Sequence, residues 1–510
     1  MFALRDYQQT AVDATLAALD RGVGAPAMQL ATGAGKTVVL AEILRRRRHL
    51  GRALCLVHRK ELVEQIAATV GRHLGCPVGI EQGGDRTWFA DPVVVASVPT
   101  VGRERAGRLD ALDPGEFATV VIDEVHHAVP ANRTYARPLA WAGVLDEGFR
   151  RTGRGPALIG CSATLARSDG QSLAKWFDEV VADVPLRWLI DQGHLAPLRG
   201  IVLRTGVELD RVRAVAGDFV ARDLEIAVNV DDRNQLAVDH YLQHAADRQF
   251  LAFVPGVQHA LDLAEMYRQS GIAAAAVSGK TPADERAAAI RAYRQGRLKG
   301  LVNVGVFTEG TDLPNTAAVY MLRPTMSQLI YSQMVGRGTR KWTAADWDAA
   351  HPELPWQGQA LGLDPVKRDC LVVDLVDNTS RHQLVAAPSL LGQGYENDAV
   401  PSNVAAATGG ASLSVEPVPV GDFEQGLSVV PEEVDLWAGG GDSTPFNTWF
   451  EDGERNWHLV SARAAAHVYR LGPVYVVSFD DLPYANSPHL SLTAAMDRAS
   501  RLMAPHVEWR

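Results

Sequence analysis

The chain has 510 residues and a formal net charge of −10, with 47% hydrophobic and 22% charged residues. A chain of this length exceeds one ordinary domain, so we expect two or three domains, each able to bury a core. The acidic balance argues against a general electrostatic attraction for nucleic acid, so a nucleic-acid partner has to be inferred from motifs.

The four cysteines, Cys55, Cys76, Cys161 and Cys370, are dispersed and form no CxxC pair. This spacing gives no readable zinc site or disulfide framework, and it fits a reducing, cytoplasmic setting. The first residues carry charge at once and lack a signal-peptide core, and no apolar run reaches the roughly 18 residues of a membrane span. We therefore expect a cytoplasmic protein with no membrane partner.

Short apolar runs alternate with amphipathic stretches up to about Val376. The candidate strands form two series: Ala53–Val57, Val93–Ser97, Thr119–Ile122 and Ala157–Cys161, then Gln249–Val254, Ala273–Val277, Gly300–Val304, Ala317–Leu322 and Cys370–Val376. Helix-like segments such as Lys60–Leu74, in which apolar residues recur at spacing four, lie between them. Strands that alternate with helices predict two α/β lobes with doubly wound parallel sheets.

The predicted domain boundaries follow changes in composition. The segment Trp188–Leu198 interrupts the pattern between the two series, so the lobes are predicted to cover residues 1–190 and 191–385. Residues 386–440 are rich in Gly, Ser, Pro and Ala with weak periodicity, which is typical of a linker. Residues 441–510 are predicted to form a small α+β appendage.

The appendage has strand-like runs at His458–Val460 and Val474–Phe479 and a helix-like run at Ser491–Met503. The aromatic residues in this region include Trp437, Trp449, Trp457, Trp509, Tyr469, Tyr475 and Tyr484. Exposed aromatic side chains stack on single-stranded bases or anchor a protein partner, but in so small a domain we expect them to form the core.

The segment Leu30–Thr37, LATGAGKT, is predicted to bind phosphate. Gly33 and Gly35 allow the backbone to curl so that its N–H groups point inward, and the helix that follows adds its positive N-terminal end. Lys36 is expected to reach the β and γ phosphates of ATP, and the Thr37 hydroxyl to hold Mg²⁺. The alternative is a Gly-rich turn without a ligand, but a helix-like run follows, as a phosphate loop requires.

Four consecutive arginines, Arg45–Arg48, end that helix-like run. They could contact DNA. A solvated basic last turn that complements the helix dipole is the more common arrangement, and it is the one that we expect.

A second motif, Thr119–His127, is an apolar strand that ends in two carboxylates. Asp123 is expected to bind Mg²⁺ through water, and Glu124 to orient and deprotonate the attacking water. An acidic pair can simply close a strand, but a phosphate loop earlier in the chain favours ATP hydrolysis. His126 is expected to link hydrolysis to the next motif by a hydrogen bond, whereas His127 is equally compatible with a structural role.

With these motifs in this order, the chain resembles the superfamily-2 helicases over about Leu4 to Val376. The branch that it resembles contains motor subunits of type I and type III restriction enzymes, RadD-like repair helicases, and DEVH-type (DEAD/DEAH-box) repair and transcription helicases. The helicase variant of the phosphate loop tolerates Leu30 where the full pattern has glycine. The resemblance implies two tandem RecA-like lobes, ATP and Mg²⁺ as cofactors, and a role in DNA repair or restriction.

The resemblance assigns further residues to ATP. Arg5, Tyr7 and Gln8 look like the element that reads adenine, with the Tyr7 ring stacked on the base and the Gln8 amide on its edge. The phosphate cradle is Thr32, Gly33, Ala34, Gly35, Lys36 and Thr37. In motif V of the second lobe, Gly310 permits a tight turn and Asp312 reaches the ribose.

Contacts with one nucleic-acid strand are implied at six positions. They are Arg59 in motif Ia, Ser97 and Thr100 in motif Ib, Ser278 and Gly279 in a backbone-gripping turn, and Thr308 in motif V. Ser162 and Thr164 resemble motif III, which couples the ATP state to lobe movement. Phosphate contacts carry no sequence information, so we expect binding that is nearly independent of sequence.

The segment Tyr331–Arg340, YSQMVGRGTR, resembles motif VI. Arg337 and Arg340 are three positions apart and so share one face of a helical turn. The resemblance makes both of them arginine fingers for the γ-phosphate, a contact worth about 10³ to 10⁵ in rate, with Gln333 beside them. The alternative is a surface pair of salt-bridged arginines.

The predicted function is an ATP-dependent DNA helicase or translocase. Two alternatives stay open: a motor ATPase subunit of a restriction or defence complex that unwinds little alone, and an ATP-dependent RNA helicase. No cysteine follows Cys370, so we do not expect the zinc module of RadD-like relatives, and no nuclease constellation is apparent outside the motor. The predicted partners are single- or double-stranded DNA, with RNA less favoured, and a protein partner at the C-terminal domain.

Overall fold

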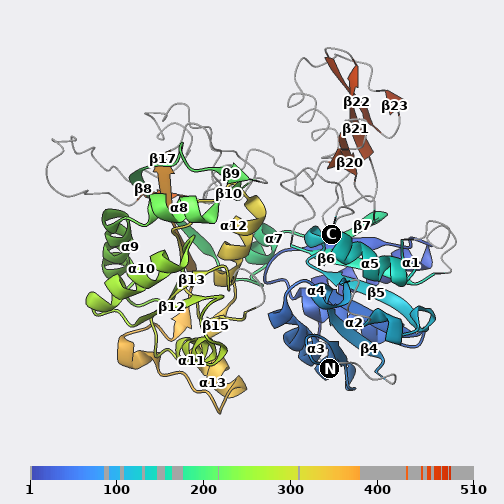
Figure 1. Cartoon of the computed structure of the whole chain (residues 1–510), viewed down its shortest axis with the longest axis horizontal. Coiled ribbons are helices and arrows are strands. Elements are labelled where there is room, and N and C mark those ends of the chain that lie inside the picture. Colours follow the sequence, from blue (N-terminus) through green and yellow to red (C-terminus); the bar gives the residue numbers. More distant parts are fainter. Residues whose placement is uncertain are drawn as a thin grey trace. The chain divides into compact units, whose positions relative to one another are not determined.

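The computed structural model contains two compact units, Met1–Leu195 with Gly441–Arg510, and Ala196–Gly440 (Figure 1). The structure describes residues 3–85, 91–103, 108–128, 132–145, 155–163, 176–215, 218–307 and 311–378, and the backbone of six short strands beyond them. Each unit has its own sheet and core.

The first unit is built on a seven-stranded parallel sheet in the order β3-β4-β2-β5-β6-β1-β7. Its strands are β1 (Pro26–Leu30), β2 (Arg52–Val57), β3 (Gly79–Glu81), β4 (Val93–Ser97), β5 (Phe117–Asp123), β6 (Ala157–Ser162) and β7 (Glu179–Val184). Its helices are α1 (Asp6–Asp20), α2 (Lys36–Arg47), α3 (Lys60–Leu74), α4 (Val98–Val101), α5 (Arg133–Trp141) and α7 (Leu186–Asp191), with short 3-10 turns η2 (Leu109–Ala111), η3 (Pro114–Glu116) and η4 (Val125–His127).

Alternate residues of each strand face opposite layers of helices, because successive side chains of a strand point to opposite faces. On β2, Ala53, Cys55 and Val57 belong to the core formed with α1, α2 and α3. Leu54 and Leu56 belong to the core formed with α4 and α5. Burial on both faces explains why the strands of this parallel sheet are continuous apolar runs in the sequence.

The second unit repeats this architecture, with a sheet in the order β12-β13-β11-β14-β17-β8-β18. Its strands are β8 (Leu198–Glu208), β11 (Phe250–Phe253), β12 (Ala274–Ser278), β13 (Gly300–Val304), β14 (Ala318–Met321), β17 (Cys370–Asn378) and β18 (Glu432–Val434), and only β18 runs antiparallel to its neighbour. Its helices are α8 (Ala221–Val228), α9 (Asp231–His244), α10 (Val257–Gln269), α11 (Ala283–Arg294), α12 (Gln328–Val335) and α13 (Ala344–Ala350), beside the hairpin β9 (Ala214–Val215) and β10 (Asp218–Phe219). Tyr241 of α9 and Tyr267 of α10 pack on one face of the sheet.

A small module lies between α12 and β17 in the second unit. It consists of β15 (Trp342–Thr343), α13, the 3-10 turn η7 (Gly358–Leu361) and β16 (Val366–Lys367), and β15 pairs antiparallel with β16. Trp342, Trp347 and Trp356 pack together with Leu363 as a core of its own. A further 3-10 turn, η6 (Gly336–Gly338), joins this module to α12.

Five strands near the C-terminus form a separate antiparallel sheet in the order β19-β20-β21-β22-β23. They are β19 (Phe450–Glu451), β20 (Trp457–Val460), β21 (Ala465–Leu471), β22 (Val474–Phe479) and β23 (Leu482–Pro483). The strands predicted at His458–Val460 and Val474–Phe479 are confirmed. The helix predicted at Ser491–Met503 lies outside the described residues, as do the side chains of the aromatic residues named for this region.

The predicted α/β fold with two doubly wound parallel sheets is confirmed, and every strand predicted for the two lobes is present. The sequence pattern did not indicate β1, β3, β7 and β8 of the two sheets. β18 lies within residues 386–440, the predicted linker, and adds an edge strand to the second sheet. In the part of the chain that the structure describes, no helix has the length and apolar character to cross a bilayer.

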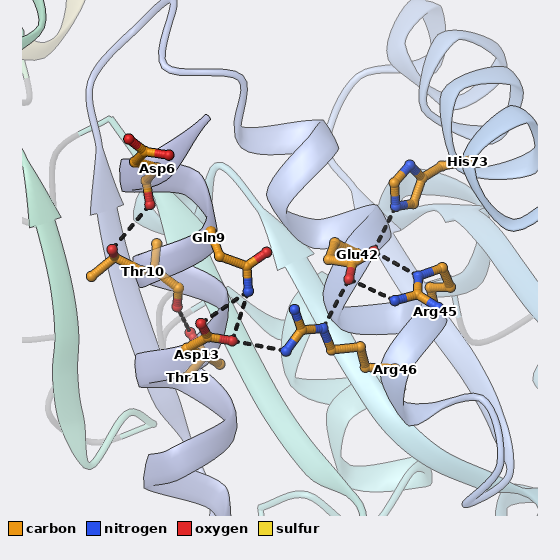
Figure 2. A network of polar contacts seen from close by, with 10 residues as sticks. Asp6, Gln9, Thr10, Asp13, Thr15, Glu42, Arg45, Arg46 and His73 are labelled. Atoms are coloured by element: carbon orange, nitrogen blue, oxygen red, sulfur yellow. Dashed lines mark hydrogen bonds and ion pairs between the residues drawn. The ribbon is translucent and has the colours of Figure 1, made fainter. Parts of the chain in front are cut away.

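A buried carboxylate, Glu42, connects α2 with α3 and, through Arg46, with α1 (Figure 2). Arg45 Nε and Arg46 Nε donate to its oxygens at 2.7 and 2.8 Å, and His73 Nε2 on α3 lies 2.7 Å from Oε2. Arg46 also donates to Asp13 on α1 at 2.8 Å. The hydrogen bond from Arg45 is the largest cause that holds the pKa of Glu42 well below its usual range, against the opposing effect of burial.

Arg45, Arg46 and Arg47 of the basic run are thus engaged within the first unit. Besides the two arginines bound to Glu42, Arg47 Nε donates to the hydroxyl of Thr119 on β5 at 2.9 Å. These arginines lie in the last turn of α2, as expected, but protein groups hold their side chains, whereas a solvated turn was expected.

We expect Glu42→Gln to lower the free energy of unfolding by about 2 to 4 kcal/mol at neutral pH, because the cations around it lose their buried carboxylate. Urea-induced unfolding measures this loss. Asp13→Asn is the matched control, since 55% of the Asp13 side chain is exposed and such a pair is worth less than about 1 kcal/mol. Equal losses in the two variants would contradict this assignment.

The same carboxylate predicts a pH dependence of stability. The pKa of Glu42 is lower in the folded chain than in the unfolded chain, where glutamate titrates at about 4.3. The unfolded state therefore takes up the proton first, so the stabilisation is complete above about pH 4.3 and is lost as the pH falls further. The stability difference between the wild type and Glu42→Gln should shrink when unfolding is repeated from about pH 6 to about pH 3.

Candidate nucleotide-binding site

The carboxyl ends of three neighbouring strands, β5, β6 and β1, bring the predicted ATP residues of the first unit together. β5 ends at Asp123, β6 ends at Ser162, and β1 continues after Leu30 into the predicted phosphate loop. In the strand register Asp123 pairs with Cys161, and Ser162 with Gln29. This is the edge at which an open α/β sheet binds its ligands.

The loop between β1 and α2 is curled as a phosphate cradle requires. Gly33 and Gly35 have φ values of 91° and 81°, a left-handed conformation that glycine adopts without steric cost. Gly35 is the N-cap of α2, so the first N–H groups of that helix open towards the loop. The carbonyl of Ala34 accepts hydrogen bonds from the Tyr7 hydroxyl at 2.9 Å and the Gln8 amide at 2.8 Å, so α1 fixes the shape of the loop.

The residues predicted to read adenine are engaged within the first unit. The Tyr7 residue is 6% exposed, and its ring packs against Trp188 and His194 at centroid distances of 5.7 and 4.9 Å. The Arg5 guanidinium donates to the His194 carbonyl at 3.3 Å, and the Arg5 N–H donates to Gln8 Oε1 at 3.0 Å. Tyr7 and Gln8 thus support the phosphate loop, and their contact with adenine stays a prediction.

Lys36 and Glu124 form an ion pair at this sheet edge. Lys36 Nζ lies 2.9 Å from Glu124 Oε1, and the two side chains are 13% and 12% exposed. Burial opposes the charge on Lys36, but Glu124 and then Asp123 outweigh it and raise the pKa of the ammonium. Lys36 is therefore charged at neutral pH, and it neutralises the carboxylate that was predicted to act as the base.

Glu124 also begins a short chain of polar contacts. The Ser162 hydroxyl donates to Glu124 Oε2 at 3.4 Å and lies 2.8 Å from His126 Nδ1. His126 Nδ1 is itself 3.4 Å from Glu124 Oε2. The structure thus brings together two of the three residues named for coupling, whereas the third, Thr164, lies outside the described residues.

The backbone at Glu124 is left-handed, with φ 53° and ψ 57°. Among the residues that the structure describes, it is the one non-glycine residue with a positive φ. Such a conformation costs about 1 to 3 kcal/mol and persists where its surroundings require it, most often at active sites. Here it ends β5 and starts the turn η4, which places Asp123 and Glu124 in the same sheet edge as Lys36.

The loop and the acidic pair fit ATP with Mg²⁺. Thr37 is half-buried in the first turn of α2, and Asp123 is 6% exposed at the end of β5. Hydroxyl and carboxylate oxygens suit Mg²⁺, which takes one or two protein ligands and completes its shell with phosphate oxygens and water. Thr32 is half-buried in the same loop.

The residues of the first unit predicted to touch nucleic acid lie at the ends of β2 and β4. Arg59 is the N-cap of α3, Ser97 ends β4, and Thr100 lies in α4. Ser97 is fully buried, whereas Arg59 and Thr100 are half-buried. Arg59 and Thr100 are therefore the more accessible of the three.

Sequence reasoning missed His58. Its ring stacks on that of His127, with centroids 4.1 Å apart and 15° between the planes. The contact joins the turn after the acidic pair to the residue that precedes Arg59. A signal was present in the sequence, because His58 directly follows β2 and His127 lies in the turn after β5, and β2 and β5 are neighbours in the sheet.

In the second unit, the motif VI residues lie on α12 and in the turn after it. Gln333 is buried on α12. Arg337 donates to the carbonyl of Thr311 at 3.0 Å, and Arg340 forms an ion pair with Asp312. The structure thus brings Asp312, Arg337 and Arg340 together. Arg340 is salt-bridged, as in the alternative of salt-bridged surface arginines, and its partner is the motif V residue Asp312.

The remaining predicted contacts are only partly described. Ser278 ends β12 and is 5% exposed, and its N–H donates to the Thr281 hydroxyl at 2.9 Å. Gly279 is exposed. Thr308 and Gly310 lie outside the described residues.

Comparison with known families gives one match in each unit. Residues 1–167 match the model described as "Type III restriction enzyme, res subunit". Residues 233–341 match the model described as "Helicase conserved C-terminal domain". The first match contains the phosphate loop and the acidic pair, and the second contains motifs V and VI, so the two sheets belong to two tandem RecA-like domains.

Several known proteins are similar over most of this chain. The chain is 30% identical over 403 residues to IRC3 of Saccharomyces cerevisiae, a candidate ATP-dependent helicase, with 76% of this chain and 53% of IRC3 covered. It is 32% identical over 399 residues to irc3 of Schizosaccharomyces pombe, a candidate mitochondrial ATP-dependent helicase, with 76% and 60% covered. The chain therefore spans only part of the length of each yeast relative.

A solved structure shares the fold. It is a fragment of a candidate HsdR subunit of a type I restriction enzyme from Vibrio vulnificus, with a TM-score of 0.51 and 19% identity. The alignment covers 76% of this chain and 71% of that one.

We expect Gly35→Ala to weaken ATP binding by about 10- to 100-fold, because a left-handed alanine costs about 1 to 2 kcal/mol and the Gln8 hydrogen bond is lost. A Cβ at this position would lie 2.5 Å from Gln8 Nε2. Equilibrium titration with a fluorescent ATP analogue measures the affinity.

The matched control is Gly75→Ala, which has φ +68° and no atom within 4 Å of the added Cβ. It carries the same kind of backbone strain at the end of α3 but should keep the affinity of the wild type. The assignment fails if Gly35→Ala binds the analogue as tightly as Gly75→Ala does.

Proposed function

We infer that this chain hydrolyses ATP to move along DNA, because it belongs to helicase superfamily 2 and resembles the motor subunits of restriction enzymes. The observation that carries the proposal is the meeting of Lys36, Asp123 and Glu124 at one sheet edge, beside a curled glycine loop. Phosphoryl transfer requires a cation for the phosphates, a carboxylate for the metal and a group that positions the water.

The Lys36–Glu124 ion pair gives ATP a direct effect on the base. A triphosphate carries more negative charge than one carboxylate, so it attracts the Lys36 ammonium away from Glu124. Glu124 then has no cation against Oε1 and accepts a proton from water. The Ser162 hydroxyl, 3.4 Å from Oε2, keeps the carboxylate oriented. In this proposal the base becomes available only when a nucleotide is bound.

The other residues of the loop hold the nucleotide in place. The N–H groups at the start of α2 bind the phosphate oxygens, and the left-handed glycines keep these groups turned inward. Thr37 and Asp123 are proposed to hold Mg²⁺, which neutralises phosphate charge when it is bound.

Arg337 and Arg340, together with Gln333, are proposed to stabilise the γ-phosphate in the transition state. Arg340 is paired with Asp312, and Arg337 with a backbone carbonyl. Arg340 would exchange its partner Asp312 for phosphate, just as Lys36 would exchange its partner Glu124 for phosphate.

DNA is the proposed track. The family that matches the first unit is described as a restriction-enzyme subunit, and so is the structural neighbour. The residues of motif VI also resemble those of DNA helicases more than those of RNA helicases. Arg59, Thr100 and Gly279 are proposed to contact the strand backbone. Backbone contacts carry no sequence information, so movement is expected on any sequence.

A second candidate is an ATPase subunit of a restriction or defence complex with little unwinding activity alone. The match of residues 1–167 to a restriction-enzyme subunit favours it. In that case a protein partner, proposed to bind residues 441–510, supplies the missing activity. An RNA helicase, a cytoplasmic location and a role in DNA repair remain predictions.

Steady-state ATPase rates without polymer, with single-stranded DNA, with duplex DNA and with RNA test the proposal. We expect DNA to stimulate the ATPase rate strongly. In the blank Glu124→Gln, which lacks the base, we expect that rate to fall by about 10²- to 10⁴-fold. Stimulation by RNA alone would move the chain to the RNA helicases. No stimulation by any polymer would favour the second candidate.

We expect Lys36→Ala to abolish turnover, with a fall in kcat of at least about 10³-fold, because Lys36 supplies the cation of the phosphate loop itself. The DNA-stimulated ATPase rate measures it. Lys299→Ala, which removes a lysine bound to the Ala246 carbonyl in the second unit, is the control and should keep wild-type turnover. Wild-type turnover in Lys36→Ala would refute the ATP assignment.

A further inference from the structure

Lys367 is a buried lysine whose hydrogen-bond partners in the described structure are both backbone carbonyls. Its Nζ donates to the Gly338 carbonyl at 2.5 Å and to the Pro314 carbonyl at 3.4 Å. The residue is 8% exposed. It lies on β16, which pairs with Trp342 on β15.

The two carbonyls belong to different motifs. Gly338 lies in the turn η6 between Arg337 and Arg340, and Pro314 follows Asp312 by two residues. Lys367 therefore bridges the turn of motif VI to the end of motif V. It does so from the small module that follows motif VI and that carries none of the motifs assigned to ATP.

The turn at Gly338 is also held from its other side. A Cβ at Gly338 would collide with Sγ of Cys370 on β17, so the backbone there lies directly against the sheet. The Thr339 hydroxyl donates to the Gly336 carbonyl at 2.9 Å. The turn is thus fixed by close packing against β17, by a local hydrogen bond and by the Lys367 ammonium.

We propose that Lys367 is a positioning residue: its ammonium ties the motif VI turn, at Gly338, to the motif V segment, at Pro314. It thereby sets the placement of Arg337 and Arg340 for the γ-phosphate. The inference rests on the proposed function, because it concerns the efficiency of the same ATP hydrolysis.

Charge matters to this bridge, because a hydrogen bond from an ammonium is roughly twice as strong as one from a neutral amine. Burial lowers the pKa of Lys367 to about 8. Cys370 and Asp369 act against this shift, whereas Arg340 and Arg248 add to it. Lys367 also lines a cavity of about 790 Å³, which gives solvent a route for proton exchange.

The signs of the two pH effects differ. Lysine in the unfolded chain has a pKa of about 10.4, so between about pH 8 and about pH 10 the unfolded state binds more protons. Stability due to this group therefore rises with pH over that range, while the bridge weakens as Nζ loses its charge. A fall in turnover above about pH 8 would thus not reflect unfolding caused by Lys367.

The test compares Lys367→Met and Lys367→Arg with Lys299→Met. Lys299 is the matched control, since its Nζ donates to the Ala246 carbonyl at 2.6 Å and burial also lowers its pKa, but it contacts neither motif. DNA-stimulated ATPase is measured from about pH 6.5 to about pH 9.5, and thermal melting at neutral pH confirms that each variant is folded.

We expect Lys367→Met to lower kcat by about 10- to 100-fold, as a misplaced catalytic group does, with the KM for ATP within about twofold of the wild type. The wild type should lose activity above about pH 8, and Lys367→Arg should lack this loss because arginine stays charged. The ATPase rate of Lys367→Met should not change with pH in the same range, which keeps the test valid even if arginine does not fit at this position.

Three outcomes would overturn the inference: a kcat in folded Lys367→Met equal to that of Lys299→Met, a loss of activity in Lys367→Met expressed only in KM, or an alkaline loss that persists in both Lys367 variants. These outcomes are distinct from failure of the proposed function. In that case the wild type itself would show no DNA-stimulated turnover at any pH.

Discussion

The ion pair between Lys36 and Glu124 is the interaction around which the first unit is arranged. Its two residues come from a loop after β1 and from the end of β5, and they meet because β6 alone separates these strands in the sheet. A left-handed residue at Glu124 and two left-handed glycines in the loop complete the approach. Tyr7 and Gln8 hold the loop through the Ala34 carbonyl, and α2 is tied to its neighbours through Glu42. Each of these contacts limits where the lysine and the carboxylate can lie.

The charged residues assigned to ATP share one property in both units. Each is held by a partner within the chain: Lys36 by Glu124, Arg340 by Asp312 and Arg337 by the Thr311 carbonyl. A partly buried cation without a partner is costly, so such pairs stabilise the nucleotide-free protein. In the proposed mechanism, a phosphate that replaces the partner keeps the cation paired, and it frees a carboxylate where that partner is Glu124 or Asp312. Under the proposed function, such an exchange of partners would leave no buried charge uncompensated.

Most of the fold was predictable, because parallel strands buried on both faces give continuous apolar runs, and β13 was predicted with both of its ends. β1 was missed because Pro26–Leu30 begins with proline and contains no β-branched or aromatic residue. The motif residues were found by spacing, but spacing cannot identify their partners. The stack of His58 on His127 depends on strand order. The bridge from Lys367 to Gly338 depends on a module without a recognisable motif. The burial of Tyr7 against Trp188 is likewise a tertiary contact that no local pattern indicates.

Translocation kinetics test whether ATP turnover at this sheet edge moves the chain along DNA. Protein pre-bound to DNA tracks of increasing length, single-stranded or duplex and labelled at either end, is mixed with ATP and a trap for released protein. We expect a lag before the end signal that grows in proportion to track length with ATP, and no such lag in Glu124→Gln. DNA-stimulated ATP hydrolysis with a lag independent of track length would contradict this expectation.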